Sequence, residues 1–263
     1  MVRNLHFLAR SVHETLIRSV SHFTLDGVGL EYTWWGTAAR GARQVLLVHG
    51  ALRSAWTWEW LGPSLAAALK TRVVAISRYG HGRSDTPPAG APDARFVQEA
   101  TELLPAFRKA LSLDDVLLVG ESEGAAIALI HAASSSAGVA GVVALAPWVR
   151  FERSIVQWVC AAHPSARARH RADDETIALS RNTWQAPEME QWSVEAFLGS
   201  VRCPVVAVQS PGDSAISAIQ SQRIARGVSR ADSVWLSGVT TLDSENTNLV
   251  CDLTAELFGT PVV

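Results

Sequence analysis

The chain has 263 residues, of which 48% are hydrophobic and 18% charged, and its formal net charge is −2. This composition excludes a disordered chain and argues against general nucleic-acid binding, which requires a strong positive charge. The three cysteines form no CxxC pair and have no zinc-site spacing, so a disulfide framework is excluded. We expect one α/β body with an insertion, in the cytoplasm.

The N-terminal residues 3–20 carry apolar side chains at helical spacing. We expect residues 1–22 to contain an amphipathic helix that packs on the body of the protein. A contact with a second copy of the chain or with a carrier protein is the alternative. Polar residues interrupt the segment, so it matches neither a secretory signal nor a membrane span, and we expect no contact with a membrane.

Short apolar strands alternate with helices along the rest of the chain. Residues 22–25 and 30–35 predict a hairpin around Asp26-Gly27. Further strands are predicted at 44–48, 72–76, 115–119, 141–146, 204–209 and 233–236, and helices at 63–69, 96–111 with a break or kink at Pro105, 125–133 and 248–258. This alternation is typical of a doubly wound, mostly parallel sheet, built here from residues 23–148 and 202–263.

Residues 149–201 interrupt the alternation, and we expect them to form a helical cap over the strand ends. The segment carries a basic run and an acidic run, which we interpret as a solvated face. It also carries several tryptophans. Five tryptophans, three of them in this segment, are candidates for the wall of a substrate pocket, and burial in the core is the alternative. They are Trp56, Trp148, Trp158, Trp184 and Trp192.

The strongest chemical signal is the segment GESEG at residues 120–124, which matches the pattern G-x-S-x-G. It follows a predicted strand and opens a predicted helix, which is the context that marks a nucleophile. The glycines permit a tight turn that lifts the Ser122 hydroxyl above the edge of the sheet. The turn also places the amide of Glu123 at a helix N-terminus, where it can bind a developing oxyanion.

This segment resembles the corresponding region of the α/β-hydrolase family. The resemblance extends over about Phe23 to Phe258. It also rests on a His-Gly pair after a strand, on GHGRS after the next strand, and on a Gly-Asp pair after the penultimate strand, at residues 49–50, 80–84 and 212–213 respectively. It implies that His49 and His81 shape loops and do not act as bases.

The resemblance implies the roles of two further residues and a type of reaction. The amide of Ala51 would be the second oxyanion donor, and Asp213 the acid of a catalytic triad. The expected substrate is a small hydrophobic carboxyl derivative, which is an ester, a lactone or a thioester. No metal-binding pattern or nucleotide-binding loop occurs in the sequence, and we expect no cofactor.

The triad lacks its base. The family places a His between the last strand and the last helix, but no His follows His170, and Thr241 stands about where the base belongs. A threonine hydroxyl is not basic at neutral pH, so it cannot take the proton of Ser122.

Three explanations remain open for the missing base. The first is a histidine of the inserted segment, and the second is a carboxylate that supports different chemistry. The third is a homologue without hydrolysis, which is a lyase, a cyclase, an acyl-transfer enzyme or a ligand-binding protein. The side chains considered as replacement bases are His163, His170, Glu121, Glu123, Asp243 and Glu245.

Overall fold

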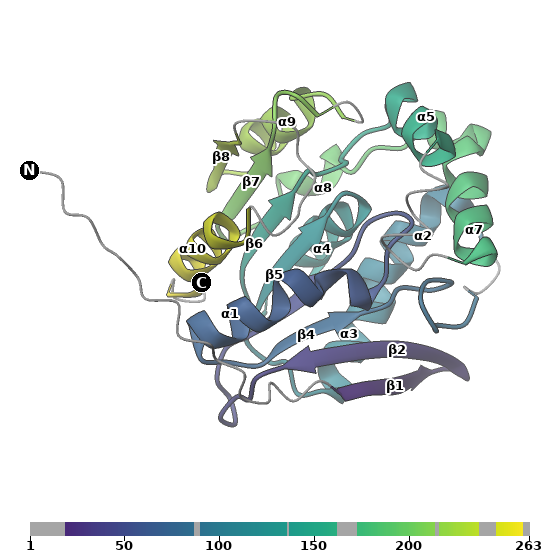
Figure 1. Cartoon of the computed structure of the whole chain (residues 1–263). Coiled ribbons are helices and arrows are strands. Elements are labelled where there is room, and N and C mark those ends of the chain that lie inside the picture. The colour runs from purple at the N-terminus through teal and green to yellow at the C-terminus, as the bar shows by residue number, and fades with distance from the viewer. Residues whose placement is uncertain are drawn as a thin grey trace, which may run out of the picture.

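The computed structural model describes residues 19–86, 90–135, 137–161, 173–213, 216–236 and 246–259. Within these residues one sheet has the strand order β1-β2-β4-β3-β5-β6-β7-β8 (Figure 1). The strands are β1 (Ser19–Leu25), β2 (Val28–Trp35), β3 (Gln44–Val48), β4 (Val73–Ile76), β5 (Val116–Glu121), β6 (Val139–Leu145), β7 (Val205–Gln209) and β8 (Ala231–Trp235). Strands β3 to β8 are parallel to one another, and β2 pairs antiparallel with β1 and β4. The predicted fold class is confirmed.

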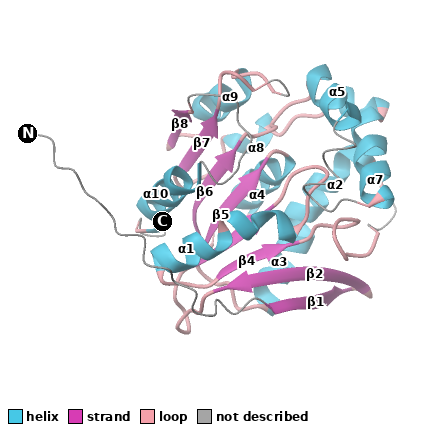
Figure 2. Cartoon of the chain, viewed as in Figure 1, coloured by secondary structure: helices cyan, strands magenta, loops and turns pink. Residues whose placement is uncertain are grey.

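Helices cover both faces of this sheet (Figure 2). Successive strand residues point to opposite faces, and every residue of β3 and β5 is buried, so these two strands are covered on both sides. The helices and short helical turns are η1 (Ala55–Trp60), α1 (Gly62–Leu69), α2 (Pro92–Gln98), the π-helical turn η2 (Glu99–Leu103), α3 (Leu104–Ala110), α4 (Glu123–Ser134), α5 (Arg153–Ala161), α7 (Asp174–Gln185), η3 (Pro187–Gln191), α8 (Glu195–Leu198), α9 (Ile219–Gly227) and α10 (Thr247–Phe258). Helices α1 and α10 cover one face, and α2, α3, α4, α8 and α9 cover the other.

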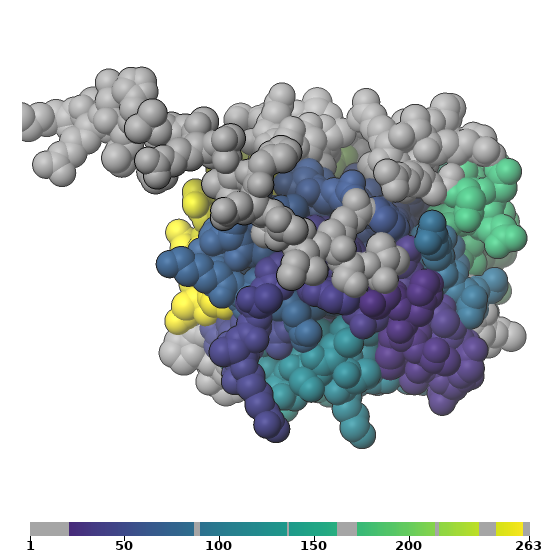
Figure 3. All heavy atoms as spheres, turned by 60° about the horizontal axis from the view of Figure 1, so that its bottom comes forward, coloured from purple at the N-terminus to yellow at the C-terminus, as the bar shows by residue number. Residues whose placement is uncertain are grey.

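The first described strand corrects the predicted N-terminal helix. Ser19 and Val20, expected at the end of that helix, belong to β1, where Ser19 pairs with Trp34 and Val20 with Thr33. The cross-strand partners supplied by β2 decide the structure here over the helical spacing of the apolar residues. The remainder of the predicted helix lies outside the described residues. Figure 3 shows the purple β1–β2 hairpin at the surface of the molecule.

The predicted helix at 96–111 is broken, as expected, close to Pro105. It starts earlier than predicted, at Pro92, because proline fits the first turn of a helix, where its missing N–H is not needed. The π-helical turn η2 comes just before Pro105, which cannot donate a backbone hydrogen bond. Helix α9 was not predicted from the sequence, since Ile224 is its one buried apolar side chain.

Residues 149–201 form a helical insertion with α5, α7, η3 and α8, and residues 162–172 lie outside the described part. Its two ends run side by side, since the amide of Phe151 donates to the carbonyl of Trp192 at 3.0 Å and that of Val194 to Val149 at 2.8 Å. Helices α5 and α7 lie beside the ends of the parallel strands (Figure 1). The insertion is therefore placed next to the edge of the sheet where β5 ends.

Candidate active site

Ser122 occupies a sharp turn between β5 and α4. Its backbone angles are φ 51° and ψ −115°, a conformation that is costly for any residue other than glycine, by about 1–3 kcal/mol. Three hydrogen bonds fix the turn. The Ser122 amide donates to the carbonyl of Leu145 at 2.9 Å, and the Ser122 carbonyl accepts from the amides of Ala125 at 3.1 Å and Trp148 at 3.2 Å. The tight turn expected for GESEG is therefore present.

Three glycines allow the backbone to pass close to this turn. A Cβ at Gly120 would lie 2.4 Å from the carbonyl oxygen of Gly124, and a Cβ at Gly124 would lie 2.1 Å from that of Val48. A Cβ at Gly50 would lie 3.2 Å from the Oγ of Ser122. The loop after β3 thus runs directly beside the serine. Ala51, the next residue of that loop, is buried.

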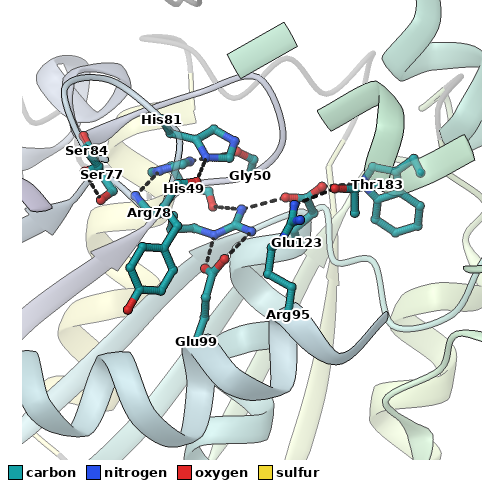
Figure 4. A network of polar contacts seen from close by, with 12 residues as sticks. His49, Gly50, Ser77, Arg78, His81, Ser84, Arg95, Glu99, Glu123 and Thr183 are labelled. Carbon is teal, nitrogen blue, oxygen red and sulfur yellow. Dashed lines mark hydrogen bonds and ion pairs between the residues drawn. The ribbon is translucent and has the colours of Figure 1, made fainter. Parts of the chain in front are cut away.

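The carboxylate of Glu123 is held by two buried donors. Arg78 Nη1 lies 2.6 Å from Glu123 Oε2, and the indole N–H of Trp184 donates to Glu123 Oε1. Arg78 also pairs with Glu99 through an Nε–Oε2 distance of 2.6 Å (Figure 4). This carboxylate is one of the candidate replacement bases, but both of its oxygens already have partners.

Burial and the ion pairs shift the pKa values of this network in opposite directions. Burial alone lowers the pKa of Arg78, but the charges of Glu99 and Glu123 raise it above the ordinary value for arginine. Burial raises the pKa of Glu99, and Arg78 opposes this shift only in part. Arg78 is thus charged at any pH of interest, and it stabilises two buried carboxylates.

The buried histidines of the described residues have structural partners. His49 Nδ1 lies 2.8 Å from the carbonyl oxygen of Gly50, so it carries the hydrogen, and His49 Nε2 accepts from the amide of Arg78 at 2.9 Å. Burial, followed by the neighbouring His81 and Arg78, lowers the pKa of His49. Burial likewise lowers the pKa of His81 to about 3 and that of His131 to about 4. These three rings are neutral at pH 7.

Glu121 and Arg53 form an ion pair beside Ser122 that the sequence analysis missed. Arg53 Nη2 lies 2.9 Å from Glu121 Oε1, and both side chains are largely buried. Burial raises the pKa of Glu121, Arg53 lowers it, and the negative charge of Asp213 raises it further. Asp213 follows β7, as expected, and its Oδ1 accepts from the amide of Ile216 at 3.3 Å. Two carboxylates and one guanidinium are therefore neighbours at this end of the sheet.

Four of the five candidate pocket tryptophans meet in one aromatic cluster between the insertion and the core. Trp184 packs edge-on against Trp148, with ring centroids 5.1 Å apart, and against Trp192, at 5.3 Å. Trp158 packs against Trp148 at 5.9 Å. Trp148, Trp184 and Trp192 are buried. Trp184 also lines a cavity of about 580 Å³ between α5 and the segment 184–190.

The fifth tryptophan is anchored by a buried carboxylate that sequence reasoning did not find. The indole N–H of Trp56 donates to Glu31 Oε1 at 2.9 Å, and the hydroxyl of Ser77 donates to Glu31 Oε2 at 2.8 Å. The Ser77 hydroxyl in turn accepts from the amide of Ala55 at 3.0 Å. Glu31, on β2, therefore connects η1 with the segment after β4. A lone acidic residue in a strand gave no signal for this role.

Several sequence candidates lie outside the described residues, namely Thr241, His163, His170, Asp243 and Glu245. Among the residues that are described, no three His, Cys, Asp or Glu side chains gather in a way that could hold a metal ion. A search of the same residues finds no helix with the length and apolarity needed to cross a membrane.

An open, mostly parallel sheet with a serine on a strained strand-to-helix turn is typical of one large class of enzymes. A model of the alpha/beta hydrolase family matches residues 45–252, and the chain belongs to this family.

Solved structures show the same fold at low sequence identity. An enol-lactonase from Burkholderia xenovorans LB400 is 14% identical, with 90% of this chain and 99% of that chain covered and a TM-score of 0.73. A thioesterase domain from the curacin biosynthetic pathway is 19% identical, with 90% and 99% covered and a TM-score of 0.63. The naproxen esterase (carboxylesterase NP) of Bacillus subtilis is 13% identical, with 93% and 92% covered and a TM-score of 0.70.

Proposed function

We propose that the chain is an enzyme that acts on a small hydrophobic ester, lactone or thioester through Ser122. The observation that carries this proposal is the strained turn at Ser122, with the backbone of Gly50 packed against its side chain. Such strain is retained where a side chain must be presented for chemistry. A lactonase, a thioesterase and an esterase with the same fold support this class of substrate.

The proposed reaction is acyl transfer. The Ser122 oxygen attacks the carbonyl carbon while a base accepts the hydroxyl proton, and the resulting oxyanion is bound by the amides of Ala51 and Glu123. The tetrahedral intermediate expels the alcohol or thiol, which takes up the proton, and leaves an acyl-enzyme. Water then hydrolyses the acyl-enzyme by the same steps. Asp213 would orient or stabilise the base.

No histidine of the described residues serves Ser122 as a base, and this supports a second candidate function. His49 and His131 are buried and have partners at both ring nitrogens, and His81 lines a small cavity that Ser122 does not line, so none of them is a base for Ser122. Glu121 is a buried carboxylate with a raised pKa next to Ser122. A homologue that abstracts a proton, or that binds a ligand without turnover, is the alternative.

The deciding experiment compares the wild-type chain with Ser122→Ala. Both are assayed with a short-chain aryl ester, a γ-lactone and an acyl thioester, and labelling by a fluorophosphonate is followed by intact-mass spectrometry. Turnover and labelling that disappear in Ser122→Ala support the acyl-transfer proposal. Turnover that survives in Ser122→Ala overturns it. Ligand binding without turnover, equal in both proteins, favours the second candidate.

We also propose that the protein acts in the cytoplasm on a free small molecule. Self-association, or contact with a carrier protein, through residues 1–22 is the alternative. Sedimentation velocity of the full chain at two concentrations tests the self-association, and an acyl-carrier substrate compared with its free thioester tests the carrier.

A further inference from the structure

Two polar atoms at the junction of the insertion and the core have no hydrogen-bond partner among the described residues. They are the Nε2 of His81, in the loop after β4, and the Oγ of Ser180, on α7. Both residues are 4% exposed, so bulk water does not reach them. Both line the same small cavity, which is also bordered by Arg78, Arg95 and Glu123. Such buried polar atoms are rare, because leaving them unbonded costs free energy.

The hydrogen bond on the other side of the imidazole fixes what His81 can offer to this cavity. His81 Nδ1 lies 2.8 Å from the carbonyl oxygen of Tyr79. A carbonyl only accepts, so Nδ1 carries the hydrogen and Nε2 presents a lone pair. Burial, followed by the charge of Arg78, lowers the pKa of His81 to about 3, and the ring stays neutral. Whatever occupies the cavity must therefore donate a hydrogen bond, which excludes a simple anion.

The size of the cavity limits the occupant further. The volume within which the centre of a water molecule can move in this cavity is about 10 Å³. A single water needs roughly 10–15 Å³ by this measure, together with two to four polar partners. The charged residues of the wall do not favour a cation, since two arginines and one glutamate line the cavity. We propose that the cavity is a binding site for one water molecule, which donates to His81 Nε2 and shares a second hydrogen bond with Ser180 Oγ.

This water completes a polar contact between α7 and the core. Two direct links lie beside it, because Arg95 Nη1 donates to Thr183 Oγ1 at 2.7 Å and the indole of Trp184 donates to Glu123. The water adds a link from Ser180 to the His81 ring. That ring packs on His49 at 4.9 Å between centroids. The inference concerns the docking of the insertion and holds whether or not Ser122 is a nucleophile.

A crystal structure of the full chain at high resolution tests the site directly. We expect one spherical density peak in the cavity, within about 2.7–3.2 Å of both His81 Nε2 and Ser180 Oγ. An empty cavity overturns the proposal, and so does a direct hydrogen bond between the two side chains. A peak that scatters anomalously, as chloride does, also overturns it.

The variant Ser180→Ala gives an independent test by the sign of its effect. If water bridges the two groups, the variant loses a hydrogen bond, and its melting temperature falls by about 2–5 °C. If the hydroxyl is unbonded, its removal relieves a buried polar group, and the melting temperature stays unchanged or rises, which contradicts the proposal. The exposed helical Ser134, changed to Ala, measures the effect of helix propensity alone.

Discussion

The indole N–H of Trp184 donates a hydrogen bond to the carboxylate of Glu123, although the two residues are 61 positions apart and lie in different parts of the fold. Glu123 follows Ser122 directly, and its amide is the expected oxyanion donor. Trp184 belongs to α7 of the insertion. The position of an inserted helix is thus tied to the first residue of the helix that follows the serine.

The variant Trp184→Phe is expected to be less stable than Trp58→Phe. Both tryptophans are 1% exposed, so the two substitutions remove a similar buried volume. The indole of Trp184 bonds a carboxylate, whereas that of Trp58 has no partner among the described residues. Loss of a hydrogen bond to a charged group costs about 1.5–3 kcal/mol, which should separate the two free energies of unfolding in urea. Equal losses would mean that the hydrogen bond contributes nothing.

Replacing Arg78 with Met should destabilise the protein by about 3–5 kcal/mol at pH 8, because Glu99 and Glu123 lose the cation between them. The pKa of Glu99 is already raised by burial, and without Arg78 it rises further. A carboxyl group with a raised pKa in the folded state stabilises the fold fully below about pH 4. That contribution is lost as the pH rises through the raised pKa. We therefore expect the loss to become smaller from pH 8 to pH 5.

Urea midpoints at pH 8, 7, 6 and 5 check this dependence. The exposed Arg226, changed to Met, is the control for removal of a charge at the surface. A loss in Arg78→Met that is constant from pH 8 to pH 5 would contradict the buried-carboxylate explanation.

The variant Gly50→Ala should impair Ser122 more than it impairs the fold. Its new Cβ would lie 2.8 Å from the Cβ and 3.2 Å from the Oγ of Ser122, so the serine or the loop must shift. A displacement of this kind can cost about 10²-fold in rate. Fluorophosphonate labelling measures the effect, and a melting curve confirms that the protein is folded. Gly199→Ala is the control, because a Cβ there meets nothing within 4 Å.

The variant Thr241→His should speed Ser122-dependent ester turnover by about 10-fold or more, because a placed general base contributes about 10²–10⁴ in rate. The gain should vanish when Asp213→Asn is added, since Asp213 is the expected partner of the imidazole. Thr240→His is the neighbouring control. A wild-type chain that turns over esters rapidly, with Thr241→His adding nothing, would show that another base is already present.

The sheet could be predicted from sequence because its strands are buried on both faces. The apolar runs VLLV in β3 and VLLV in β5 identify strands without knowledge of their neighbours. The turn at Ser122 could be predicted because its strand, its glycines and its helix are adjacent in the chain. Its catalytic role and the roles of Ala51 and Asp213 remain predictions.

The buried charge pairs could not be predicted in this way. Arg78 meets Glu99 and Glu123 across 21 and 45 positions, and Arg53 meets Glu121 from a separate loop. Pairing over such distances leaves no periodic pattern in the sequence. Arg53, Arg78 and Glu99 look like ordinary surface charges until the strands and helices are assembled. The same holds for Glu31 and its partners Trp56 and Ser77.

The buried network around Arg78 also constrains the order in which a growing chain can complete its fold. Arg78, Glu99 and Glu123 have all been synthesised once the chain reaches residue 123. The indole that donates to Glu123 belongs to Trp184, which is synthesised later. A nascent chain that ends before α7 lacks the indole donor for Glu123, so water competes for this carboxylate. Final closure of this region during synthesis therefore has to await the inserted segment, even though β3, β4 and β5 are already available.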